Sequence, residues 1–230
     1  MRRYAIFLIA IPLALVSVRL GFWQLSRLHQ RRALNASLKT AMAQPPIRLN
    51  ERPGRVEPFH PVSVTGRFDY ERQLVVDGVS QQGMPGVIVV TPVMIADSDA
   101  VLVERGWIVS PDGRTVDVAR VRETDSATIQ GFAVEPGPDA GLAVGEEWPR
   151  HVLRPSPTAV ARLYPYHLLP YLVRRSDPPA LGSPLRPVPL PELTEGPHLG
   201  YAFQWFFFAA VALVGSVVIY RREKGVQRAG

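Results

Sequence analysis

Two long apolar runs, one near each end of the chain, enclose a body in which apolar and polar positions alternate over short distances. The first run predicts a helix over residues 4–23, in which Ser17 and Arg19 are the polar positions. The second run carries no charge and predicts a helix over residues 200–220. A bilayer core about 30 Å thick requires roughly 20 helical residues. Both runs therefore predict transmembrane helices.

The helical pattern of the first run continues into the body. Leu34, Leu38 and Met42 recur at helical spacing, and the adjacent prolines Pro45 and Pro46 end the pattern. We therefore expect the first helix to extend beyond the membrane and to end near residue 43.

The body itself predicts a β-rich domain. Short runs rich in β-branched residues predict strands over residues 61–68, 73–77, 86–93, 100–109, 116–121, 126–134 and 168–175. Gly66, Gly106 and Gly131 interrupt three of these runs and indicate bulges or tight bends. Residues 156–163 predict one short helix. The predicted fold class is a membrane α+β protein, with two transmembrane helices flanking one exported, antiparallel, barrel-like domain over residues 24–177.

A proline-rich segment follows this domain. Seven prolines fall between Pro178 and Pro197, a density that excludes a helix or a central strand. Residues 178–199 are therefore expected to form an extended connector to the second transmembrane helix. Residues 1–3 and 221–230 remain as short ends outside the two predicted membrane segments.

Charge is distributed unevenly along the chain. The formal net charge is +6, but residues 24–200 carry 19 basic and 19 acidic side chains, so the excess lies in and beside the apolar runs. A nucleic-acid-binding protein would carry its basic patch on the folded body, so this class is excluded. The positive-inside rule places both chain ends in the cytoplasm and exports the body. Basic residues just after the first run weaken this asymmetry there: Arg19, Arg27, Arg31 and Arg32.

The first run has an alternative interpretation as a cleaved signal peptide, since Arg2 and Arg3 precede a short apolar stretch. No small-x-small cleavage site precedes Arg19, and the helical pattern continues, which favours an uncleaved anchor. The short N-terminus also lacks an Arg- and Ser-rich transit peptide, which favours the inner membrane of a bacterium over that of a mitochondrion.

Little in the body indicates catalysis. The sequence has no GxGxxG, Walker A, GxSxG or HExxH motif, and its five histidines are scattered. We therefore expect no enzymatic activity, although an exported enzyme remains an alternative. The absence of cysteine leaves the exported domain without disulfides and argues against delivery of copper(I), which prefers thiolate or thioether ligands.

Short motifs stand in order along the chain. They are Gly21-x-Trp23-Gln24-x-x-Arg27 after the first run, Arg105-Gly106-Trp107 in the body, Trp148 further on, and His198-Leu199-x-Tyr201-Ala202-x-x-Trp205 at the second run. In these motifs and in its two-helix layout the chain resembles the surfeit locus protein 1 family, whose members are assembly factors for cytochrome c oxidase. It departs from that family at Glu104 and Gly196, where the family usually has Asn.

This resemblance implies a non-enzymatic chaperone whose partners are oxidase subunit I and the machinery of haem a synthesis. It also implies that haem a binds through His198, as an axial ligand of the haem iron. On a helix that begins at His198, Tyr201 and Trp205 share its face. We therefore expect a haem a site at the outer membrane interface, in which Trp23 lies at the same depth. The haem propionates would pair with Arg19 or Arg27.

The same residues have simpler interpretations as membrane anchors. His198 could be only a polar helix start near the interface. Trp23, Tyr201 and Trp205 could be members of an aromatic belt. The side chains of Arg19 and Arg27 could extend to the bilayer edge.

Two further residues have alternative roles in protein contact. Gln24 could contact a partner protein or could cap the bilayer edge. Trp107 could contact a partner or belong to the core of the body. The whole chain could likewise be a two-helix scaffold that binds other proteins without haem, and haem in the purified protein would separate these functions.

Overall fold

The structure is a computed structural model that describes residues 2–51, 54–135, 145 and 147–229. The chain divides into two compact units. Residues 1–37 and 192–230 form the first, here called the helical unit, and residues 38–191 form the second, here called the β unit. Residues 52–53, 136–144 and 146 of the expected β-rich domain, and the terminal residues 1 and 230, lie outside the described part of the chain.

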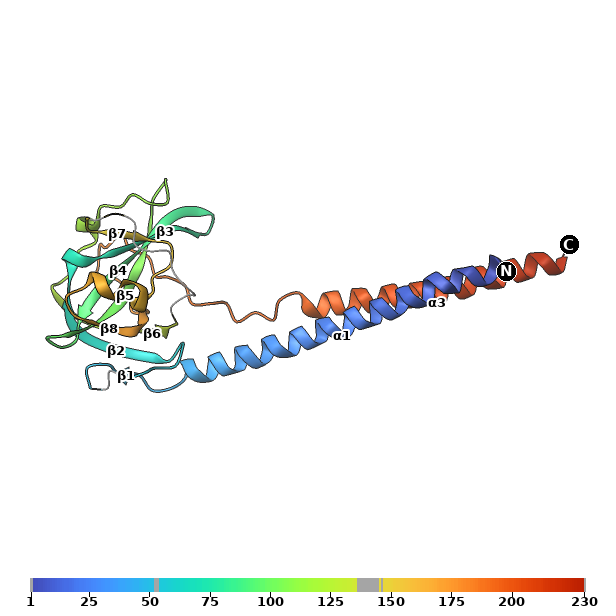
Figure 1. Cartoon of the computed structure of the whole chain (residues 1–230), viewed down its shortest axis with the longest axis horizontal. Helices are drawn as coiled ribbons and strands as arrows, with labels where there is room; N and C mark the ends of the chain where they lie inside the picture. The colour runs from blue at the N-terminus through green and yellow to red at the C-terminus, as the bar shows by residue number, and fades with distance from the viewer. Residues whose placement is uncertain (1, 52–53, 136–144, 146, 230) are drawn as a thin grey trace. The chain divides into compact units, whose positions relative to one another are not determined.

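The helical unit contains α3 (His198–Ala229) and all but the last five residues of α1 (Arg2–Met42) (Figure 1). α1 ends one residue before the predicted end, ahead of the two prolines that stop it. Both helices are long and apolar enough to cross a membrane, judged by length and composition. The prediction of two apolar helices that flank a β-rich domain is confirmed.

The two helices pack along a seam of mostly small side chains. Buried positions recur at intervals of three, four or seven residues: Ala10, Ala14, Ser17, Gly21, Leu28 and Asn35 in α1, and Ala202, Ala209 and Ser216 in α3. This heptad spacing keeps one face of each helix toward the other, and small residues let the two backbones approach closely. Large apolar side chains outside the seam, such as Leu8 and Phe203, are exposed.

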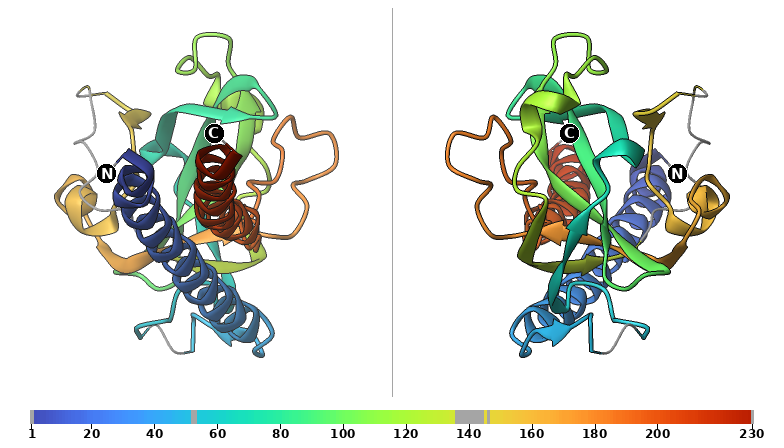
Figure 2. Two further views of the ribbon diagram at one scale, coloured as in Figure 1. Left: turned by 90° about the vertical axis from the view of Figure 1, so that its right-hand side faces the viewer. Right: turned by 90° about the vertical axis from the view of Figure 1, so that its left-hand side faces the viewer.

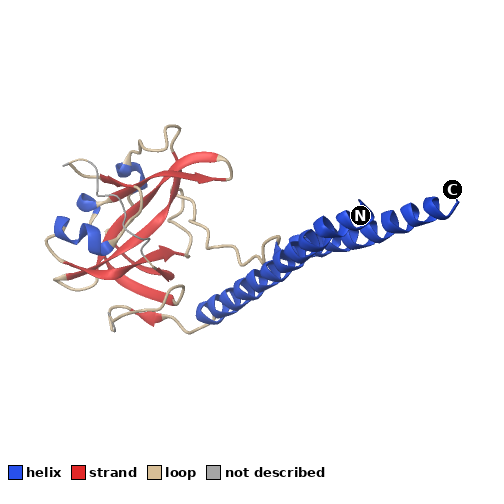
Figure 3. Ribbon diagram, turned by 45° about the vertical axis from the view of Figure 1, so that its right-hand side comes forward, coloured by secondary structure: helices blue, strands red, loops and turns tan. Residues whose placement is uncertain are grey.

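The β unit contains eight strands among its described residues (Figure 3, red). They are β1 (Ile47–Arg48), β2 (Pro61–Phe68), β3 (Leu74–Gln81), β4 (Met84–Met94), β5 (Asp99–Val109), β6 (Ser126–Val134), β7 (Arg150–Val152) and β8 (His167–Arg175). Short helical turns connect them: η1 (Tyr70–Arg72), η2 (Val118–Val121), α2 (Pro157–Val160) and η3 (Ala161–Leu163). The predicted short helix over 156–163 is thus observed as the successive turns α2 and η3.

The strands follow the order β1-β2-β6-β8-β5-β4-β3-β7. An extra antiparallel pairing of β2 with β4, at Arg67–Met94 and Phe68–Val93, brings the strands into a partial ring (Figure 2). The prediction of an antiparallel sheet is correct for most pairs and wrong for three, because β1–β2, β3–β7 and β5–β8 are parallel. In the last case β8 lies between β5 and β6, which run in opposite directions. It is therefore parallel to one of them, β5, and antiparallel to the other, β6.

One predicted strand, over residues 116–121, is wrong. Its later part is the 3₁₀ turn η2, which the Asp117 side chain caps by accepting a 3.1 Å hydrogen bond from the backbone N–H of Ala119. Val121 is the buried residue of this turn. The β-branched composition misled the prediction, since capping by an Asp side chain competes directly with strand pairing.

β5 carries a bulge that sets the position of the Arg-Gly-Trp motif. Val89 pairs with Gly106 and Val90 pairs with Glu104, so Arg105 is the extra residue of the bulge. The extra residue shifts the alternation of side chains along the strand. Val103 therefore packs in one hydrophobic cluster, and Trp107 packs in the second cluster. The bulge expected at Gly106 is confirmed next to it, whereas Gly66 and Gly131 lie in regular ladders.

Candidate functional site at the start of the C-terminal helix

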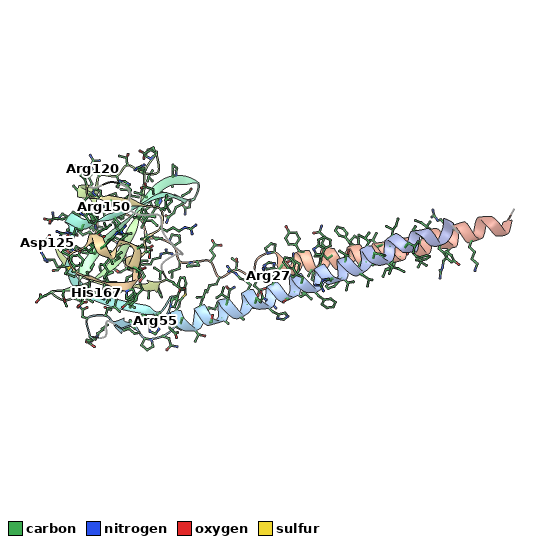
Figure 4. All side chains as sticks on the ribbon, in the orientation of Figure 1. Arg27, Arg55, Arg120, Asp125, Arg150 and His167 are labelled. Atoms are coloured by element: carbon green, nitrogen blue, oxygen red, sulfur yellow. The ribbon has the colours of Figure 1, made fainter. Side chains whose placement is uncertain are left out.

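His198 is the first residue of α3, and its side chain is half-buried against α1. Its Nδ1 atom lies 2.9 Å from Oε1 of Gln24, which belongs to the first of the four motifs. Gln24 falls in the seam between Gly21 and Leu28, so helix packing fixes its position. Arg27, three residues further along α1, is labelled in Figure 4.

This contact decides which ring nitrogen of His198 is available. Because an amide oxygen can only accept, a hydrogen bond at this contact requires the ring proton on Nδ1, and Nε2 then retains its lone pair. The hydrogen bonds found in the described part of the chain do not engage Nε2. A neutral imidazole with a free Nε2 is a suitable ligand for haem iron.

Gly196 lies next to this free nitrogen. Its φ of +69° is in the left-handed region, which Gly adopts without strain and which Asn tolerates better than most residues. A Cβ at this position would stand 3.6 Å from Nε2 of His198, so glycine leaves space beside the ligand atom. Gly196, which stands where the resembled family usually has Asn, can therefore adopt the same left-handed backbone conformation before His198.

A polar clamp ties the segment before His198 to α1. The carbonyl oxygen of Thr194 accepts hydrogen bonds from Arg31 Nε at 3.2 Å and from Asn35 Nδ2 at 3.0 Å. Arg32 makes two contacts of 2.8 Å with the carboxylate of Glu195. The Arg32–Glu195 pair is about half exposed and adds little stability by itself, but the paired geometry restricts where α3 begins.

The other predicted site residues lie in three environments. Arg19 and Trp23 line one apolar groove of α1 together with Leu15, Val18, Leu20 and Phe22. Arg27 stacks over the ring of Trp23, with its Cζ atom 5.7 Å from the ring centroid, and donates to Gln30 Oε1 at 3.1 Å. Tyr201 is exposed and Trp205 is half-buried, with its ring 5.9 Å from that of Phe208.

The structure thus brings Gln24 to His198 directly and places Arg19, Trp23 and Arg27 on one helix. The donor set fits a haem group in kind: a neutral imidazole, aromatic and aliphatic side chains, and two exposed cations for carboxylates. Gln24, for which the sequence predicts a partner contact or a place at the bilayer edge, is hydrogen-bonded within its own chain, and the partner contact stays a prediction.

Trp107 is a core residue. Its side chain is fully buried, and its indole N–H donates to the carbonyl oxygen of Val79 at 3.1 Å. Its backbone pairs in both directions with Arg186 at 2.7 Å, which fastens the proline-rich segment onto β5. A side chain without exposed surface offers nothing to a partner, so the structure supports the core interpretation and not the partner contact.

Arg105, in the same motif, belongs to a buried ion network that the sequence did not predict. Arg105 Nη2 lies 2.6 Å from Glu123 Oε1, and Arg175 Nη1 lies 2.8 Å from Glu123 Oε2. Arg175 also pairs with Asp177, and Arg105 contacts the carbonyl oxygen of Val121. Burial opposes ionisation of Glu123, but hydrogen bonds and the charges of Arg175 and Arg105 hold its pKa below the ordinary value.

Glu104, the second departure from the resembled family, is also paired. Its Oε2 atom accepts a 2.6 Å hydrogen bond from Arg174 Nε, on the neighbouring strand β8. The charged side chain is buried, and its partner compensates that burial. The substitution therefore fits the sheet locally.

Comparison with known proteins agrees with the motifs. The model of the SURF1 family matches residues 11–210. A SURF1-like protein of Rickettsia felis is 27% identical over 216 residues, which cover 90% of this chain and 93% of that protein. A SURF1-like protein of Monosiga brevicollis is 25% identical over 240 residues, which cover 97% and 89% of the two chains. The cytochrome oxidase assembly protein SHY1 of Saccharomyces cerevisiae is 32% identical over 111 residues, which cover 44% of this chain and 28% of SHY1. With most of its length matched by the family model, this chain belongs to the SURF1 family.

Proposed function

We propose that this protein is a membrane-anchored assembly factor of cytochrome c oxidase that binds haem a at His198 and aids its insertion into subunit I. The observation that carries the proposal is the half-buried His198, whose Nδ1 atom is engaged by Gln24 while no hydrogen bond from the described residues engages its Nε2 atom. Membership of the SURF1 family and similarity to an oxidase assembly protein of yeast support a role in the assembly of cytochrome oxidase.

The proposed location is the inner membrane of a bacterium. The two apolar helices and their heptad seam are consistent with a helix pair in lipid. The basic residues after the second apolar run favour cytoplasmic ends and an exported β unit. His198 would then lie at the outer interface, because it begins the second helix on the exported side.

At that interface haem a is cargo and not a resident cofactor, and it supplies redox chemistry only after transfer to the oxidase. His198 Nε2 would hold the iron, and Trp23, Tyr201 and Trp205 would contact the porphyrin. Arg19 and Arg27 would pair with the propionates. The protein has no catalytic step in this proposal, and its partners are subunit I and the machinery of haem a synthesis.

A deletion strain tests this function. Without the protein, purified oxidase should contain less haem a and show lower activity, and the wild-type gene should restore both. A His198→Ala gene should restore less than a His29→Ala gene, which changes an exposed histidine of α1. Normal haem content in the oxidase of the deletion strain would contradict the proposal. Full restoration by His198→Ala would instead favour the alternative, a scaffold that acts without haem.

A further inference from the structure

The contact between Gln24 and His198 joins two motifs that are 174 residues apart in sequence. Both side chains are half-buried, and both belong to the helical unit. Gln24 occupies a seam position, and the other seam positions of α1 hold small or apolar residues except Asn35, whose amide binds the carbonyl oxygen of Thr194. Packing alone does not require an amide there, because Leu28 fills the next seam position with an aliphatic side chain.

We infer that Gln24 is a positioning residue, whose amide oxygen holds His198 in the Nδ1–H tautomer and presents Nε2 as the haem ligand. The inference rests on the proposed function, since it deepens the account of the same site. A neutral histidine without a partner favours the Nε2–H tautomer, in which the outer nitrogen has no lone pair to offer. An acceptor at Nδ1 reverses this preference and raises the basicity of the free nitrogen.

The residues just before His198 hold its ring in place beside Gln24. The polar clamp fixes the chain just before His198, through Arg31 and Asn35 on Thr194. Gly196 leaves space on the Nε2 side, where its nearest approach to the ring nitrogen would be 3.6 Å even with a Cβ. The ring is thus hydrogen-bonded on the α1 side, and no hydrogen bond in the described part of the chain engages its Nε2 atom.

The tautomer can be measured in the full-length, haem-free protein. We would label histidine with ¹⁵N and record the shifts of both ring nitrogens in detergent at a pH where the ring is neutral. Wild type should show a protonated Nδ1 and an unprotonated Nε2. Gln24→Leu, which keeps a side chain suited to the seam, should shift His198 toward Nε2–H. A wild-type Nε2–H tautomer, or an unchanged tautomer in Gln24→Leu, would overturn the inference.

Haem binding gives a second readout. Gln24→Leu should weaken haem a binding about 10- to 100-fold, the usual effect of removing a hydrogen-bond partner from a ligating histidine. Gln24→Glu keeps an acceptor and should retain haem, with a lower reduction potential because the ligand becomes more basic. Gln204→Leu, a change of an exposed glutamine on α3, should match wild type in both. Equal affinity and potential in all four proteins would overturn the inference.

The two proposals fail in different ways. A protein that holds the Nδ1–H tautomer but takes up no haem a contradicts the proposed function and leaves the tautomer assignment in place. A protein that binds haem a through His198 with no dependence on Gln24 contradicts the positioning role and leaves the proposed function in place.

Discussion

Gly21 of α1 lies directly against the ring of Phe206 of α3, so that a Cβ on Gly21 would stand 2.6 Å from the nearest ring atom. The Phe206 ring also meets Phe22 edge-on, with the centroids 5.4 Å apart. The first glycine of the Gly-x-Trp-Gln motif is therefore a point of close approach between the helices, one turn from the Gln24–His198 contact. It determines how near the two halves of the candidate site can lie.

Enlarging Gly21 should separate the helices. We expect Gly21→Val to lower the stability of the helix pair by about 1–3 kcal/mol, as overpacking does, and to weaken the Gln24–His198 contact. Thermal unfolding in detergent measures the first effect, and the ¹⁵N shifts of His198 measure the second. Gly215→Val is the matched control, because a Cβ at Gly215 meets nothing within 4 Å. Equal losses in both variants would show that helix propensity, and not the contact with Phe206, is responsible.

The backbone at Gly196 should tolerate only residues that accept a positive φ. A left-handed conformation costs most residues about 1–2 kcal/mol, and Asn bears it better than others. Gly196→Asn should therefore retain haem a binding, whereas Gly196→Val should reduce it, since its branched side chain also approaches Nε2 of His198. Haem content of the purified variants provides the measurement. Loss of haem in Gly196→Asn equal to that in Gly196→Val would contradict the conformational explanation.

Breaking the buried ion network should destabilise the β unit. Glu123→Gln leaves Arg105 without a counter-charge at a fully buried position, which typically costs about 3–5 kcal/mol. Glu51→Gln removes one member of an exposed pair with Arg48 and should cost no more than about 1 kcal/mol. Denaturant unfolding of the full-length protein in detergent compares the two. Similar costs would mean that the network contributes no more than a surface ion pair.

The same network predicts a dependence of stability on pH. The pKa of Glu123 is lowered in the folded protein, so its contribution is fully present above the ordinary value of about 4.5 and is lost as pH falls toward the folded value. The free energy of unfolding should therefore decrease with falling pH below about 4.5. In Glu123→Gln this part of the decrease should be absent. Identical pH profiles for wild type and variant would contradict this role of Glu123.

The sequence predicted the helices well because long apolar runs have one stable outcome, and it placed the strand over 126–134 without error. The three parallel pairings were not predicted, because local alternation carries no information on which strand inserts beside another. The sequence predicted a bulge at Gly106, next to its observed position at Arg105. The buried ion network was not predicted, because it depends on contacts over 18 and 52 residues, from Arg105 and Arg175 to Glu123. No local sequence pattern predicts such long-range contacts.

The candidate site was predicted in part. The motifs identified His198 and Gln24 separately, and their contact required the helix register. The sequence does show a heptad spacing of small residues, such as Ala14 and Gly21 in α1 and Ala202 and Ala209 in α3. The stripes predict which faces of the two helices meet, but a repeat of seven residues does not fix their axial register, so the spacing alone could not have predicted the contact.

The most direct test is the absorption spectrum of full-length protein, purified in detergent from cells that make haem a. Wild type should carry a haem a spectrum, His198→Ala should lose it, and His29→Ala, which changes an exposed histidine of α1, should keep it. A wild-type protein without haem a under these conditions, or a His198→Ala protein with an unchanged spectrum, would contradict the account.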